Sequence, residues 1–177
     1  MRYNNPPKID HKGFSLRPIE TDDISAWYEY LRLPHVVEHT SWNLSSEEDL
    51  EPSILKCNST CESSNIRFTI KRPQSNKLIG TVGFHSITPA HKTAEITYDL
   101  HPDFWGQGVC SAACKAVTAW GFEVPGFVRI QATTLKSNEP SKKVLQKCGY
   151  EYEGILRKFR MVRGIPHDFL IYSKVFA

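Results

Sequence analysis

The residues best suited to chemistry form a glycine-containing stretch, Phe104 to Ser111, which reads Phe-Trp-Gly-Gln-Gly-Val-Cys-Ser. It lies between a strand-like run over 94–101 and a helix-like run over 109–123. Two glycines at such a junction let the backbone turn sharply and approach a ligand. The first turn of the next helix adds unpaired N–H groups and the positive end of its dipole. The stretch therefore predicts an anion site suited to the phosphates of a nucleotide-like cofactor, the alternative being a simple turn before a helix.

The size and composition of the chain indicate one folded domain. Its 177 residues are enough for a substantial core, and 40% hydrophobic residues is ordinary for a globular protein. A net charge of +3 is too small to indicate a nucleic-acid partner. Because no run is apolar for long enough to cross a membrane and the first residues lack a signal-peptide core, we expect a cytoplasmic protein without a membrane partner.

The cysteines and histidines give no sign of a disulfide framework or a metal site. Five cysteines cannot all pair within one chain, and none forms a C-x-x-C motif. We expect reduced cysteines that act as small apolar side chains. His35 and His39 could share a helix face, but nothing nearby completes a ligand set, so no metal is predicted.

The order of the predicted elements is β α α β β β α β α β β. Strands are expected at 14–18, 65–71, 77–87, 94–101, 127–135, 150–160 and 167–176, the second to fourth as an antiparallel meander. Helices are expected from a Thr21 cap, from Ser45 or Ser46, where Ser45 and Glu48 fit a capping box, over 109–123, and from an Asn138 cap to Gly149. Pro52 fits the second helix only if it lies in the first turn of a helix that begins later.

Several segments, taken in order, resemble the GNAT superfamily of N-acetyltransferases, and most closely its branch of ribosomal-protein alanine N-acetyltransferases. The matching segments are 94–98, 105–108, 129–132, Asn138-Glu139-Pro140-Ser141, 144–150, 153–157 and 167–168. The resemblance implies an α+β fold in a single domain over 1–177. Its mixed, mostly antiparallel central sheet would be flanked by helices, with the fourth and fifth strands splayed apart. The first 60 residues match only in outline.

The same resemblance implies an acyltransferase that moves an acetyl group from acetyl-CoA to a primary amine by direct attack. The backbone of the glycine stretch would hold the cofactor phosphates, and the pantetheine arm would lie between the splayed strands. Asn138 is similar to a family residue that touches this arm, although it could also be a plain helix cap. The implied cofactor-binding residues are Tyr98, Asp99, Leu100, Gln107, Gly108, Val109, Cys110, Ser111 and Asn138. Cys110 stands where the family usually has glycine or alanine.

Two residues are candidates for proton transfer. Glu95 lies where relatives keep a general base, and a carboxylate there could act directly or through water. The alternative is a strand glutamate in an ion pair. Many relatives have a proton-donating tyrosine at the position of Leu145, which cannot donate, and Ser141 looks like its replacement. The alternatives are a first-turn serine that bonds the cap, and Tyr150 as the donor.

The sequence leaves the acceptor open between a protein N-terminus and a small-molecule amine, and the oligomeric state between monomer and homodimer. Lys142, Lys143 and Lys147 could meet the 3′-phosphate of CoA or be ordinary surface lysines. A catalytically inactive CoA-binding or sensor module is the competing hypothesis, because Leu145 replaces the usual tyrosine. A P-loop is excluded, because no Gly-Lys-Ser/Thr follows the glycine stretch.

Overall fold

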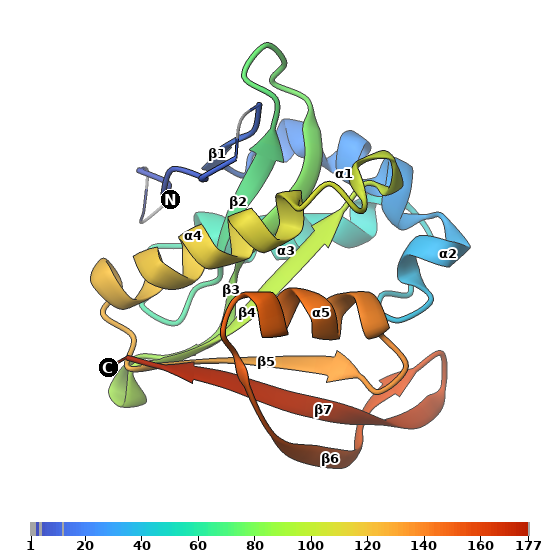
Figure 1. The fold of residues 1–177 in the computed structure, drawn as a ribbon. Helices are drawn as coiled ribbons and strands as arrows, with labels where there is room; N and C mark the ends of the chain where they lie inside the picture. Colours follow the sequence, from blue (N-terminus) through green and yellow to red (C-terminus); the bar gives the residue numbers. More distant parts are fainter. Residues whose placement is uncertain (1–2, 4, 12, 177) are drawn as a thin grey trace.

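A mixed sheet of seven strands forms the centre of the molecule in the computed structural model, which describes residues 3, 5–11 and 13–176 (Figure 1). The strands are β1 Ser15–Pro18, β2 Ile66–Lys71, β3 Leu78–Thr88, β4 Thr93–Leu100, β5 Arg129–Leu135, β6 Glu151–Val162 and β7 Ile165–Val175. Their spatial order is β1-β2-β3-β4-β5-β7-β6, and every neighbouring pair is antiparallel except β4 and β5. The expected fold class is confirmed.

Helices cover both faces of this sheet (Figure 1). On one face lie α4 (Val109–Glu123) and α5 (Glu139–Lys147), and on the other lie α1 (Ile24–Leu31) and α3 (Glu51–Asn58), with the short α2 (Pro34–Val37) nearby. The larger apolar core fills the space between α4 and the sheet, where Trp120 packs against Phe68 and Phe84. A second cluster, which includes Trp27 and Tyr30, lies under α1 and α3.

The sheet opens between β4 and β5. These parallel strands pair only through Thr93 with Arg129, Ala94 with Ile130 and Glu95 with Gln131. Beyond that point β4 stays paired with β3 as far as Leu100, and β5 stays paired with β7 as far as Leu135. The predicted splay of the fourth and fifth strands is therefore confirmed, and it begins directly after Glu95.

The first helix begins differently from the prediction. Glu20, not Thr21, is the cap residue, and its backbone N–H donates to Asp23 Oδ2 at 2.9 Å. A 3-10 turn, Thr21–Asp23, precedes α1. The buried Asp23 also accepts a hydrogen bond from Arg17. Asp23 is therefore fixed in the position where it can accept from the N–H of Glu20. The prediction of Thr21 as the cap was wrong.

The second helical segment starts at Ser46, the later of the two predicted positions, and its capping box lies one residue after the predicted Ser45 and Glu48. Ser46 and Asp49 form the capping box, and Asp49 accepts from the N–H groups of both Ser45 and Ser46. A 3-10 turn, Glu47–Leu50, follows, and α3 begins at Glu51 with Pro52 in its first turn. The later start is the arrangement in which a first-turn proline costs no hydrogen bond.

The predicted ends of α5 are confirmed. Asn138 caps α5, Pro140 lies in its first turn, and Gly149 follows its end with a φ of 76°. Within residues 3, 5–11 and 13–176, no helix has the length and apolar character needed to span a bilayer.

Candidate active site

The glycine stretch makes the turn that its residue types predict. Gly106 and Gly108 have φ values of 75° and 79°, and no atom lies within 4 Å of where a Cβ would stand on either glycine. Gly108 is the N-cap of α4, and its carbonyl accepts from Ala112 N–H at 3.0 Å. The amides of residues 109–111 therefore precede the hydrogen-bond ladder of the helix. This arrangement offers donors and a helix N-terminus to an anion.

Side chains brace the loop from outside. Gln107 Nε2 donates to the Asp103 carbonyl at 2.8 Å, and Trp105 Nε1 donates to the Leu100 carbonyl at 2.8 Å. The second bond ties the turn to the end of β4. Since the Gln107 side chain is bonded to Asp103, only the backbone of Gln107 is left for the predicted binding of phosphate.

The cysteines around this loop are not arranged as nucleophiles. All five cysteines of the chain are free. Burial raises the pKa of the Cys110 thiol, and a hydrogen bond with Cys148, reinforced by burial, raises that of Cys114. Both thiols therefore stay neutral, and a thiolate is the form that attacks. Among the described residues, no group of three or more His, Cys, Asp or Glu side chains could hold a metal ion.

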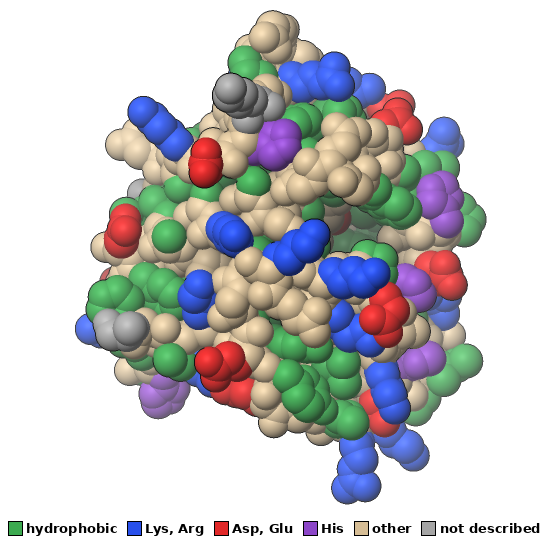
Figure 2. Space-filling view, viewed as in Figure 1, with side chains coloured by type: hydrophobic (Ala, Val, Ile, Leu, Met, Phe, Trp, Pro, Cys, Tyr) green, Lys and Arg blue, Asp and Glu red, His purple; other side chains and the backbone are tan. Residues whose placement is uncertain are grey.

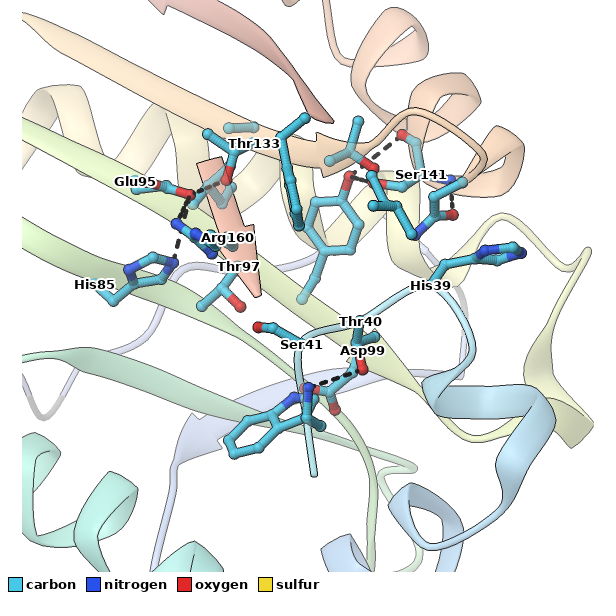
Figure 3. Close-up of a pocket in the computed structure, with 18 residues that line it drawn as sticks. His39, Thr40, Ser41, His85, Glu95, Thr97, Asp99, Thr133, Ser141 and Arg160 are labelled. Atoms are coloured by element: carbon cyan, nitrogen blue, oxygen red, sulfur yellow. Dashed lines mark hydrogen bonds and ion pairs between the residues drawn. The ribbon is translucent and has the colours of Figure 1, made fainter. Parts of the chain in front are cut away.

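The opening between β4 and β5 holds a pocket of about 140 Å³ (Figure 3). Its walls come from β3, β4, β5, α5 with its cap, β6, β7 and the segment 39–42 that follows α2. Five residues predicted for the site line it: Glu95, Tyr98, Asp99, Asn138 and Ser141. Leu100 does not line it and is buried in the larger core, and the glycine turn also lies outside its lining.

Glu95 lies at one end of this pocket in a polar cluster. The carboxylate is 4% exposed and accepts from the Thr133 hydroxyl and from Arg160 Nη2, the latter at 3.0 Å. His85 Nε2 lies 3.8 Å from Glu95 Oε1, and the Gln131 amide lies at the hydrogen-bond limit of 3.5 Å from Oε2. Glu95 thus lines the pocket, as a base would, and also forms the ion pair that was its alternative role.

His85 and Arg160 were missed by sequence reasoning. His85 is the direct cross-strand neighbour of Glu95, because β3 and β4 pair in that register. The predicted meander could have found it, had its register been worked out. Arg160 reaches the pocket from β6, after an irregular stretch between Leu156 and Arg160 that no sequence pattern announced. Its guanidinium also lies over the rings of Phe159 and Phe169, at 5.0 and 5.7 Å.

His85 has the character of a neutral imidazole. Burial lowers its pKa, and this effect outweighs the nearby Glu95 carboxylate, which acts in the opposite direction. Its Nδ1 lies 2.8 Å from the Ser86 hydroxyl. An imidazole held uncharged near neutral pH can accept a proton.

Ser141 lies at the other end of the pocket (Figure 3), where the Tyr98 hydroxyl contacts it. Asn138 Oδ1 accepts from the Ser141 N–H at 3.1 Å, as expected for a helix cap. The Tyr98 hydroxyl lies 2.9 Å from Ser141 Oγ, a contact that sequence reasoning missed because it considered only the Tyr98 backbone. Burial raises the Tyr98 pKa well above its ordinary value, so the phenol keeps its proton. Leu145 is fully buried in the core.

The Asp99 side chain faces a buried support for β4. It accepts from Thr81 Oγ1 at 2.8 Å, from Trp27 Nε1 at 3.1 Å and from Arg67 Nη1 at 3.3 Å. The Tyr30 hydroxyl donates to it as well. These bonds tie α1 and β2 to the strand that lines the pocket. Any contact of Asp99 with a cofactor is therefore left to its backbone.

Lys and Arg side chains gather on the face formed by α4 and α5 (Figure 2). Lys142 is engaged there, because its Nζ bonds Glu139 and the Lys136 carbonyl. Lys143 and Lys147 are exposed. Of the three predicted lysines, these two are the ones oriented to solvent and open to a phosphate.

Comparison with known proteins identifies the family. The model of the acetyltransferase (GNAT) domain matches residues 14–151. The chain belongs to the GNAT family of acetyltransferases. An uncharacterized N-acetyltransferase of Bacillus subtilis, YoaA, is 32% identical over 173 residues, which cover 96% of this chain and 97% of YoaA. The resemblance noted in the sequence is thus confirmed, and the chain is an acyltransferase.

Two solved structures share the fold. A ribosomal-protein-S5-alanine acetyltransferase from Vibrio fischeri has a TM-score of 0.81 and 22% identity, with 94% of each chain covered. The Microcin C7 self-immunity acetyltransferase MccE, solved with acetyl-CoA and AMP, has a TM-score of 0.83 and 24% identity, with 98% of each chain covered.

Proposed function

We propose that this GNAT protein transfers an acetyl group from acetyl-CoA to a primary amine by direct attack in the pocket between β4 and β5. The amine nitrogen forms a bond to the thioester carbon, the C–S bond breaks, one proton leaves the nitrogen and one arrives at the sulfur. The observation that carries this proposal is the pocket itself, which has proton acceptors around Glu95 at one end and the hydroxyls of Ser141 and Tyr98 at the other.

Two parts of the fold support the binding of acetyl-CoA. The amides of residues 109–111 and the turn at Gly108 suit the diphosphate, since charge-assisted hydrogen bonds are worth about 1.5–3 kcal/mol each. Residues 96–100 of β4 and 132–135 of β5 pair with outer strands but not with each other. An amide-containing pantetheine arm fits between them as an additional strand.

The reaction needs only a weak base for the amine proton and a hydrogen-bond donor for the sulfur. Glu95 is the acceptor that the sequence suggests for the amine proton. An α-amine has a pKa of about 7.7–8.0 and needs only a weak base, whereas a lysine amine near 10.4 needs a stronger one. In this proposal Ser141 donates to the departing sulfur, and the Tyr98 hydroxyl, 2.9 Å from Ser141 Oγ, supports it. This balance favours a protein N-terminus or a small weakly basic amine as the acceptor.

Acetyl-CoA binding without turnover is the second candidate, and the buried Leu145 favours it, because it leaves no tyrosine at the usual donor position. A cytoplasmic location belongs to the proposal, since free cysteines suit a reducing compartment.

A thermal-shift titration followed by a thiol-release assay tests the proposal. Acetyl-CoA at 100 times its Kd should add about 2.7 kcal/mol to the free energy of unfolding. CoA thiol should then appear with at least one member of a panel of N-terminal peptides, polyamines and amino sugars. A thermal shift without thiol release from any amine would support the inactive module, and no shift at millimolar acetyl-CoA would overturn both functions.

A further inference from the structure

The carboxylate of Glu95 is poorly placed to be the only base. Its Oε1 accepts from both the Thr133 hydroxyl and Arg160, and the guanidinium lies 3.0 Å away. These two donors occupy the lone pairs of Oε1, so this oxygen has no free position for the proton of an attacking amine. Arg160 is held there by two aromatic rings and by the pocket wall, so this pairing is built into the site.

His85 lies beside this pair and is not engaged by it. The 3.8 Å between His85 Nε2 and Glu95 Oε1 is too long for a hydrogen bond. The ring lines the pocket, and its side chain is 26% exposed. When Nδ1–H donates to the Ser86 hydroxyl at 2.8 Å, Nε2 carries the lone pair, 3.8 Å from Glu95 Oε1 at the end of the pocket.

We propose, on the basis of the function proposed above, that His85 rather than Glu95 accepts the proton of the acceptor amine. The N–H bond of the attacking amine breaks, its proton joins Nε2, and the electron pair stays on nitrogen as the amide forms. Glu95, held in place by Arg160 and Thr133, then stabilises the imidazolium across 3.8 Å. Glu95 is in this scheme a positioning and charge-stabilising residue, and the imidazolium returns its proton to solvent.

The charges around His85 agree with this division. Glu95 on β4 favours its protonated form, while Arg160 on β6 and Arg67 on β2 oppose it. Burial is the largest influence and also favours the neutral ring. His85 is therefore neutral in the resting enzyme and can accept a proton. Once protonated, the ring forms an ion pair with Glu95, which stabilises the imidazolium.

The test compares His85→Gln with Glu95→Gln, and uses His91→Gln as the matched control because His91 is exposed in the β3–β4 connection. The acceptor is a weakly basic amine that stays neutral across the pH range. We expect the wild-type kcat to fall as pH drops through a limb below about 6.5, since burial lowers the His85 pKa. His85→Gln should lower kcat about 100-fold or more and remove this limb, without changing the thermal shift caused by acetyl-CoA. Added imidazole should restore part of the rate in His85→Ala, and His91→Gln should match the wild type.

Three results would overturn the inference directly: a His85→Gln kcat within threefold of wild type, a low-pH limb that survives in His85→Gln, or a limb lost only in Glu95→Gln. A fourth, a reduced kcat in His85→Ala that imidazole does not restore, would overturn it by indicating a structural role. Failure of the proposed function is recognised separately, because the wild type would then release no thiol with any amine.

Discussion

Substituting alanine for Gly108 separates the conformational role of this glycine from its role in binding. Gly108 and Gly164 have nearly the same φ, 79° and 80°, and both have open space where a Cβ would stand. An alanine in the left-handed region costs about 1–2 kcal/mol. For a chain of this size each kcal/mol lowers Tm by about 2–4 °C, so both variants should lose about 2–8 °C.

Only Gly108→Ala should also weaken acetyl-CoA. Its new methyl group would enter the space that the phosphates approach, and losing one charge-assisted hydrogen bond reduces affinity about tenfold or more. At a concentration 100 times the wild-type Kd, the stabilisation by acetyl-CoA should fall from about 2.7 to about 1.4 kcal/mol or less. Gly164→Ala, in the β6–β7 turn, should keep the full stabilisation.

Differential scanning fluorimetry with and without acetyl-CoA measures both quantities in one experiment. Equal cofactor stabilisation in the two variants would refute the assignment of the phosphates to the glycine turn. A much larger Tm loss in Gly108→Ala than in Gly164→Ala would instead show that the turn makes contacts beyond its backbone conformation.

Two further predictions concern the hydroxyl pair and an ion pair. Ser141→Ala should lower kcat about 10- to 150-fold. Adding Tyr98→Phe should lower kcat little further, because Tyr98 acts through Ser141. Additive losses in the kinetic double-mutant cycle would contradict this. Glu153 has its pKa lowered to about 2 by hydrogen bonds from Arg129 and Ser173. Because the folded pKa lies below the ordinary 4.5, this stabilisation is complete above pH 4.5 and is lost as pH falls toward 2. Glu153→Gln should flatten that acid limb in urea titrations, by less than about 1 kcal/mol since the pair is partly exposed, and an unchanged limb would disprove the effect.

Local signals were strong enough to predict most elements. Asn138, Pro140 and Gly149 mark α5 because each residue type has a specific preference at a helix end. Thr21 was wrongly predicted as a cap, and the choice between Ser45 and Ser46 stayed open, because several polar residues compete at each start; at the first, a tertiary partner, Arg17, binds Asp23. The β6–β7 turn is tighter than expected, with positive φ at both Arg163 and Gly164.

The candidate site was predicted where it depends on residues near each other in the chain. The Ser141–Asn138 contact lies within one helical turn, so its residue types announce it. The neighbours of Glu95 come instead from other strands: His85 depends on strand register and Arg160 on an irregular stretch of β6. Neither can be located from periodicity, which fixes the face of a strand but not its alignment with another.

The larger core binds both halves of the divided sheet to the same helix. Side chains of α4 pack in one cluster with Val82 and Ile96 from one half and with Ile130 and Leu170 from the other. The helix therefore packs against both halves of the sheet and fixes their position relative to each other. The opening between the two halves is thus already formed when the chain has folded. A ligand that binds there does not have to separate the strands, so less of its binding free energy is lost to reorganisation of the protein.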